Sequence, residues 1–94
     1  MNRKETLEKA MTCVLGQREQ DYGTPEDNFA IIAGLWSVYL GTEVDAEDVA
    51  LMMALLKIAR CAAGTGKEDN YIDLAGYAAC AAEIATNQNK KAGF

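Results

Sequence analysis

Apolar residues recur at helical spacing along most of the chain. Between residues 3 and 20 they occupy positions i, i+3, i+4, i+7 and i+8, namely Leu7, Ala10, Met11, Val14 and Leu15. This spacing places them on one face of a helix, and charged residues fill the opposite face. The pattern therefore predicts an amphipathic helix over residues 3–20.

A second helix is predicted over residues 25–40 because its start and its end are both marked. Thr24 is suited to cap the helix, Pro25 suits the first helical position, and Asp27 can complete a capping box. Gly41 is the expected stop, since glycine tolerates the left-handed conformation that often closes a helix.

The third predicted helix, over residues 46–63, is apolar on nearly every side. Asp45 marks its start, with Asp48 three residues later. The apolar residues that follow are Val49, Leu51, Met52, Met53, Leu55, Leu56 and Ile58. Such a helix must be covered on more than one face. A chain of 94 residues offers few other surfaces, so we expect part of this helix to meet a second subunit.

Glycines at positions 64 and 66 end the third helix, and a fourth is predicted over residues 68–86. It is rich in alanine and glycine, which let helix axes approach closely. The polar segment 87–94 is expected to fray. No useful stretch alternates with the period of a strand. The prediction is one all-α domain, residues 1–94, forming a four-helix bundle that is completed by oligomerisation.

Composition narrows the functional classes. The net charge of −5 argues against broad binding to a nucleic-acid backbone. The absence of histidine excludes histidine-based acid–base catalysis and most transition-metal sites. The three cysteines fall inside helical patterns and suit a reducing compartment. With no signal-peptide pattern, and with Val49–Leu56 too short to cross a bilayer, we expect a cytoplasmic protein without a membrane partner.

Two pairs of opposite charge flank the glycine break. Lys57 and Arg60 lie one turn apart before it, and Asp69 and Asp73 lie one turn apart after it. The cations are suited to phosphate contact, and the carboxylates, on one helix face, are suited to Mg²⁺ with phosphates completing its shell.

Structural explanations fit the same charges. Cations near a helix C-terminus, and acids in a first turn, are favoured by about 0.3–1 kcal/mol each. Asn70-x-x-Asp73 and Thr65-x-x-Glu68 each match a capping box. Salt bridges between the two pairs would satisfy all four charged residues.

Five residues are candidates for reading a nucleotide base, because aromatic rings stack on bases and asparagine pairs with a base edge. They are Tyr22, Asn28, Trp36, Tyr71 and Tyr77. Tyr22 and Asn28 flank a glycine turn and a helix N-terminus, where anions are favoured. Trp36 is better explained as a core residue on the apolar face of its helix.

Several motifs together carry a resemblance to a known family. They are Asp21-Tyr22-Gly23-x-Pro25-x-Asp27-Asn28-Phe29, Leu35-Trp36, Leu55-Leu56-Lys57-Ile58-Ala59-Arg60 and Asp69-Asn70-x-x-Asp73-Leu74-Ala75-Gly76-Tyr77. Over about residues 17–83 the chain resembles small phage-encoded proteins related to the MazG-like all-α nucleotide pyrophosphatases. The resemblance implies a helical oligomer in the host cytoplasm. In the wider family it also implies Mg²⁺-dependent hydrolysis of nucleoside triphosphates.

The catalytic motifs of that wider family are incomplete here. Its Glu-Glu-x-x-Glu motif is missing, and Lys57-x-x-Arg60 stands at the best corresponding position. Its Glu-x-x-Asp motif has the partial match Asn70-x-x-Asp73. With Lys57 and Arg60 in place of the acidic residues, the chain keeps side chains that can hold phosphate but loses carboxylates that could bind a metal ion.

Three functions are compatible with these features. The first is a nucleotide-binding or nucleotide-sequestering phage protein, with Lys57, Arg60, Asp69, Asp73, Tyr22, Asn28 and Tyr77 lining the site. The second is a divergent Mg²⁺-dependent nucleoside triphosphate pyrophosphohydrolase that uses Asp69 and Asp73 with Asp48 or Glu83. The third is a structural or interaction oligomer in which the charged residues form salt bridges.

Overall fold

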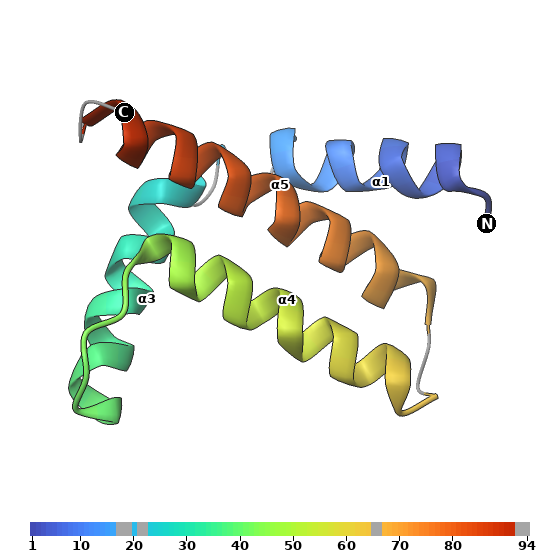
Figure 1. The fold of residues 1–94 in the computed structure, drawn as a ribbon. Helices are drawn as coiled ribbons and strands as arrows, with labels where there is room; N and C mark the ends of the chain where they lie inside the picture. Colours follow the sequence, from blue (N-terminus) through green and yellow to red (C-terminus); the bar gives the residue numbers. More distant parts are fainter. Residues whose placement is uncertain (17–19, 21–22, 65–66, 92–94) are drawn as a thin grey trace.

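The computed structural model describes residues 1–16, 20, 23–64 and 67–91. They form four helices, α1 (Arg3–Leu15), α3 (Pro25–Leu40), α4 (Ala46–Ala62) and α5 (Glu68–Lys91), labelled as in Figure 1. The described residues contain no strand. The prediction of an all-α chain is therefore confirmed.

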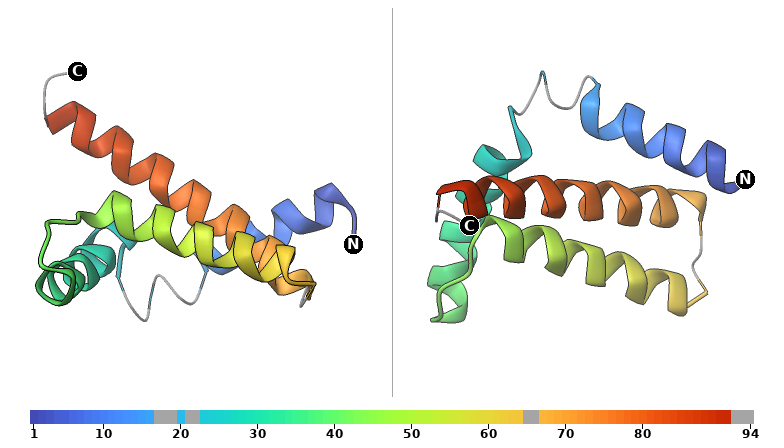
Figure 2. Two further views of the ribbon diagram at one scale, coloured as in Figure 1. Left: turned by 60° about the horizontal axis from the view of Figure 1, so that its bottom comes forward. Right: turned by 45° about the horizontal axis from the view of Figure 1, so that its top comes forward.

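Helix α5 is the element on which the other helices pack. It runs antiparallel to α4 and beside it, and α1 lies along the other side of α5 (Figure 1). Helix α3 crosses the end of this arrangement where α4 begins (Figures 1 and 2). The turn from α4 to α5 and the start of α1 lie at the opposite end. The four predicted charged residues, which flank the α4–α5 turn, are therefore remote from α3.

The core lies where α3, α4 and α5 meet. Val49 and Ile84 are fully buried, and they pack with Phe29, Ala33 and Ala50. Small residues of α5, among them Cys80 and Ala81, complete this cluster. They allow the axes of α4 and α5 to approach closely, as the small-residue composition of the last helix predicted.

Three helix starts carry side-chain caps. Thr24 Oγ1 accepts a hydrogen bond from the Asp27 N–H at 3.2 Å, with Pro25 in the first helical position. Asp45 and Asp48 form a reciprocal capping box, each carboxylate accepting from the other residue's N–H at 2.8 and 3.0 Å. The Thr24 cap, the Asp45–Asp48 start and the left-handed Gly41 after α3 agree with the sequence prediction. The bond that the Asp27 side chain was expected to return to Thr24 stays a prediction.

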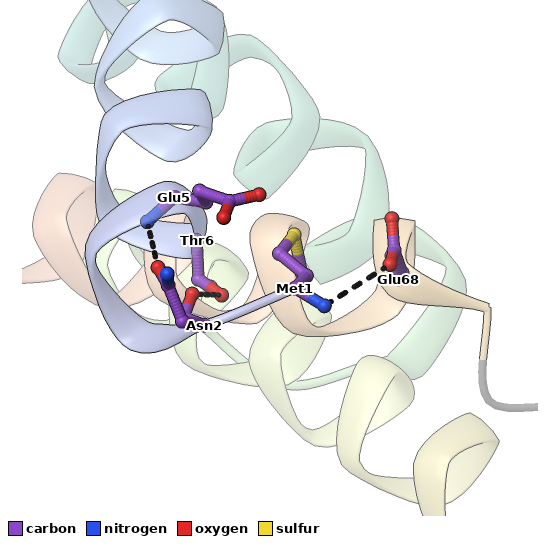
Figure 3. Close-up of polar contacts among 5 residues, drawn as sticks. All are labelled: Met1, Asn2, Glu5, Thr6 and Glu68. Carbon is purple, nitrogen blue, oxygen red and sulfur yellow. Dashed lines mark hydrogen bonds and ion pairs between the residues drawn. The ribbon is translucent and has the colours of Figure 1, made fainter.

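The start of α1 is capped by Asn2. The Asn2 side-chain oxygen accepts from the Glu5 N–H at 2.9 Å, and the Asn2 carbonyl accepts from the Thr6 hydroxyl at 2.9 Å (Figure 3). The Met1 ammonium lies 3.6 Å from Glu68 at the start of α5. These contacts place the first turn of α1 beside the first turn of α5.

Replacing Asp45 with alanine should lower the free energy of unfolding by about 0.5–2 kcal/mol, because the substitution leaves an N-terminal N–H of α4 without its acceptor. In a domain of this size, thermal denaturation should show a loss of several degrees. Glu43→Ala, at an exposed position in the preceding loop, is the control. Equal melting temperatures for the two variants would contradict the capping assignment.

The helix boundaries differ from the prediction at two places. The first helix ends at Leu15 rather than near residue 20, because the backbone of Gly16 leaves the helical conformation. Residues 17–19 lie outside the described part. The last helix continues to Lys91, beyond the predicted end at residue 86. The Asn87 amide donates to a Glu26 carboxylate oxygen at 3.1 Å, which ties this end of α5 to the start of α3.

One of the two capping boxes suggested for the last helix is wrong, and the other lies partly outside the described residues. The helix begins at Glu68, so Asn70 lies inside its first turn rather than at its cap, and the Asn70 side chain is buried. The Asn70-x-x-Asp73 box is therefore wrong. The Thr65-x-x-Glu68 box involves Thr65, which lies outside the described residues.

Large apolar side chains remain exposed on several helices, including Leu7, Met11 and Leu15 on α1, and they are most numerous on α3 and α4. On α3 these are Ile31, Leu35, Val38, Tyr39 and Leu40; on α4 they are Leu51, Met52, Leu55, Leu56 and Ile58. The spacing of Ile31, Leu35 and Val38, and of Leu51, Leu55 and Ile58, follows one helical face in each case. We call these two sets the α3 and α4 stripes. None of the helices in the described residues combines the length and apolar character needed to cross a bilayer.

Candidate functional site

One of the predicted cations meets one of the predicted carboxylates. The Lys57 Nζ atom on α4 lies 3.0 Å from the Asp73 Oδ2 atom on α5. The Lys57 side chain is only 12% exposed and that of Asp73 is 39% exposed. This partial burial makes the pair a link between α4 and α5, and it directs the Lys57 ammonium toward α5.

Arg60 lines a separate pocket at the turn between α4 and α5. The pocket has a volume of about 470 Å³, and its lining residues are Ala59, Arg60, Ala63, Lys67 and Asn70. Arg60 and Lys67 supply positive charge, and the Asn70 amide carries both donors and an acceptor. We call this cavity the basic pocket.

Lys67 is a lining residue that the sequence pattern does not single out. It directly precedes the acidic first turn of α5. A loop position of this kind has no helical spacing of apolar residues that would predict which way its side chain faces. The only hint was a third cation close in sequence to Arg60. The fold brings it to the pocket because the turn reverses the chain and returns the start of α5 to the end of α4 (Figure 1).

Asp69 and Asp73 both line a groove between α1 and α5, as their shared helix face predicted. The groove has a volume of about 620 Å³ and is lined by Glu8, Lys9, Thr12, Cys13, Asp69, Ile72 and Asp73. Within the described residues, no group of three or more acidic or cysteine side chains is placed to hold a metal ion. Mg²⁺ bound here would therefore need ligand phosphates and water to complete its coordination.

A neighbouring pocket joins Asp73 to Tyr77. It has a volume of about 410 Å³ and is lined by Thr12, Cys13, Val14, Ile72, Asp73, Gly76, Tyr77 and Cys80. The Tyr77 ring also contacts the Phe29 ring of α3, with ring centroids 6.1 Å apart. Four of its lining residues, Thr12, Cys13, Ile72 and Asp73, also line the groove between α1 and α5, so the two cavities are neighbours.

The other candidates for base recognition do not lie together at the cavities around Asp73. Asn28 is half-buried in the first turn of α3, where α3 packs near the C-terminal half of α5. Trp36 packs against the core, in agreement with its interpretation as a core residue. Tyr71 is exposed on α5 and lines neither the basic pocket nor the Tyr77 pocket. Tyr22 lies outside the described residues.

The additional acids named for a hydrolytic site are also apart from Asp69 and Asp73. Asp48 is engaged in the capping box at the start of α4, at the α3 end of the molecule. Glu83 lines a more apolar cavity further along α5, with Leu7, Leu15 and Pro25 among its other walls. Neither residue shares a pocket with the two aspartates.

Comparison with known proteins identifies phage relatives. The model of DUF6378, a domain of unknown function, matches residues 5–85. The Gene 55 protein of Mycobacterium phage D29 is 47% identical over 79 residues, which is 83% of this chain and 52% of that protein. The Gene 55 protein of Mycobacterium phage L5 is 48% identical over 73 residues, 77% of this chain and 47% of that protein.

These comparisons confirm the resemblance to phage-encoded proteins. The chain spans about half the length of both relatives. No solved structure matches the chain.

Proposed function

We propose that this chain, which belongs to the DUF6378 family, binds a nucleotide through its phosphates at the turn between α4 and α5. The observation that carries the proposal is the basic pocket, where Arg60, Lys67 and Asn70 line one cavity of about 470 Å³. The basic pocket is an open depression of the surface, so a ligand bound there would remain partly in contact with water.

The chemistry of the basic pocket favours an anion. A guanidinium group forms paired, charge-assisted hydrogen bonds with phosphate oxygens, and an ammonium group adds a point charge. The start of α5 also lies beside the pocket, but its first turn carries Glu68 and Asp69, so the positive charge comes from Arg60 and Lys67 alone. This local charge is opposite in sign to the net charge of −5, so a small phosphorylated molecule fits better than a nucleic-acid polymer.

The pair of cations assigned to phosphate is therefore revised. Lys57 is engaged by Asp73 and is mostly buried, whereas Lys67 lines the pocket with Arg60. In the proposal, Arg60 and Lys67 contact the phosphates. Lys57 acts as a positioning residue, because its ion pair fixes α5 against α4 and so sets the place of Asn70.

Calorimetric titration with pyrophosphate and with nucleoside triphosphates, without Mg²⁺, tests this function. Arg60→Gln and Lys67→Gln should each raise the dissociation constant by about 10-fold or more, since a hydrogen bond to a charged group contributes about 1.5–3 kcal/mol. Lys4→Gln, which removes an exposed lysine of α1, is the matched control. Absence of binding to every compound, or equal affinities in all three variants, would refute the proposal.

Hydrolysis is the second candidate, and the groove shared by Asp69 and Asp73 is the observation that favours it. In the MazG-like interpretation, these carboxylates would hold Mg²⁺, which would neutralise charge on the phosphates. Pyrophosphate release that requires Mg²⁺ and is lost in Asp69→Asn would support this function. Binding that is indifferent to Mg²⁺ and occurs without turnover would favour nucleotide capture or sequestration.

We also propose that the functional molecule is a homo-oligomer. The α3 and α4 stripes expose large apolar side chains in rows along a helix face, and contiguous apolar surface of this kind is typical of sites that meet a partner. A second copy of the chain offers the same surfaces, so a two-fold interface can cover both partners at once. If the protein is instead a structural or interaction oligomer, this interface would be its functional surface and the Lys57–Asp73 ion pair would only stabilise the fold. No nucleotide would then bind.

A further inference from the structure

We propose that the pocket beside Asp73 and Tyr77 binds a guanine base, so that the nucleotide recognised by this protein is a guanine nucleotide. The inference rests on the proposed function, because the phosphates of the same nucleotide occupy the basic pocket. We call the cavity the base pocket; it is lined by residues of both α1 and α5.

The walls of the base pocket suit a flat ring. Tyr77 supplies an aromatic side chain, and Val14 and Ile72 supply apolar surface. Gly76 adds no side chain, and a Cβ atom placed there would lie 3.1 Å from the Val14 side chain. Its backbone therefore brings α1 and α5 close together at the bottom of the pocket. Apolar walls with few polar groups are typical of small-molecule sites.

The polar group that selects among bases is the Asp73 carboxylate. It lines the base pocket while its Oδ2 atom receives the Lys57 ammonium from α4 at 3.0 Å. An ionised carboxylate accepts hydrogen bonds and donates none, and each oxygen has more than one acceptor position. The Lys57 contact therefore orients the carboxylate and leaves acceptor capacity toward the pocket.

Among the common bases, guanine is the best match to such an acceptor. Its Watson–Crick edge carries two adjacent donors, N1–H and the N2 amino group, which a carboxylate can accept together. Adenine and cytosine each place a ring-nitrogen acceptor beside their amino group, and that acceptor would face the carboxylate. Uracil and thymine offer one N–H between two carbonyl oxygens. An unpaired acceptor facing a carboxylate is penalised, so discrimination should be strong.

The proposal places one nucleotide across both pockets, which are lined by neighbouring residues of α5. Asn70 lines the basic pocket and Asp73 lines the base pocket, and they lie at positions i and i+3 of α5. Side chains at this spacing are neighbours on a helix surface, about 5–6 Å apart at their Cβ atoms. Lys57 and Arg60 repeat the spacing on α4. The ion pair thus stands between the proposed phosphate end and the proposed base end of the site.

Titration with GTP, ITP and ATP tests the inference. We expect GTP to bind at least 10-fold more tightly than ATP, with ITP between them because inosine keeps N1–H but lacks the amino group. Asp73→Asn should reduce the preference for GTP to within about two-fold of ATP. Asp27→Asn, an exposed aspartate in the first turn of α3, is the control and should keep the wild-type preference.

A second variant keeps the test decisive if Asp73→Asn fails to fold. Thr12→Trp introduces a large ring from the exposed face of α1 into the base pocket, and it should weaken GTP binding relative to pyrophosphate binding by about 10-fold. Equal wild-type affinities for GTP and ATP, with both reduced by Arg60→Gln, would overturn guanine recognition while retaining the proposed function. Failure of every nucleotide and of pyrophosphate to bind would overturn both.

Discussion

Replacing Ile84 with alanine is expected to lower the free energy of unfolding by about 2–5 kcal/mol. Ile84 is fully buried and packs with Val49, Phe29 and Ala33 where three helices meet. The substitution removes three carbon atoms at a site whose neighbours are held by α3, α4 and α5 together. The surroundings can close the resulting cavity only in part, and small domains have few kcal/mol to lose.

Equilibrium unfolding in urea, at a fixed protein concentration, measures this effect. The midpoint should fall with little change in slope, and Ile84→Val should show a smaller loss of about 0.5–1.5 kcal/mol. Leu7→Ala is the control, since the Leu7 side chain is 63% exposed on α1. If Ile84→Ala were no less stable than Leu7→Ala, the assignment of the core to the α3–α4–α5 junction would be wrong.

Replacing Leu55 with glutamate is expected to dissociate the oligomer that we propose. Leu55 is 62% exposed in the centre of the α4 stripe, between Leu51 and Ile58. In a monomer its replacement costs little, because an exposed side chain already contacts water. In a two-fold interface it would place two carboxylates in an apolar contact, at a cost of several kcal/mol for burial without partners.

Sedimentation velocity over a range of concentrations distinguishes the two cases. We expect the wild-type chain to sediment as an oligomer, and Leu55→Glu to raise the dissociation constant at least 100-fold, into the monomeric range. Leu7→Glu is a closely matched control, since it makes the same change at the same exposure on α1. A wild-type chain that is monomeric at all concentrations, or equal dissociation by both variants, would contradict an interface through the α4 stripe.

Local chemistry was sufficient to predict much of the fold. The starts of α3 and α4 could be predicted because each cap and its partner lie three residues apart. Their hydrogen bonds are local and do not depend on how distant segments pack. The end of α3 at Gly41 could be predicted because the left-handed conformation of a glycine is also a local property. The end of α5 could not, because the contact between Asn87 and Glu26 joins residues 61 positions apart.

The candidate site was predicted in part. Spacing along one helix correctly placed Asp69 and Asp73 in one groove, because residues at i and i+4 share a face. The candidates outside the charged segment, such as Asn28 and Asp48, were grouped with it only by their chemical type. In the fold they lie toward the α3 end of the molecule.

The sequence by itself determined that the chain is helical, where three of its helices begin, and which charged residues are neighbours on one helix. These properties depend on contacts within about four residues. Only the tertiary structure decided that Lys57 pairs with Asp73 and that Arg60 shares a pocket with Lys67 rather than with Lys57. The physical reason is that the rotation of α4 against α5 is set by burial of Val49 and Ile84 in the core. Such packing between distant segments selects which helix faces contact each other. The spacing of residues along a single helix cannot predict that choice.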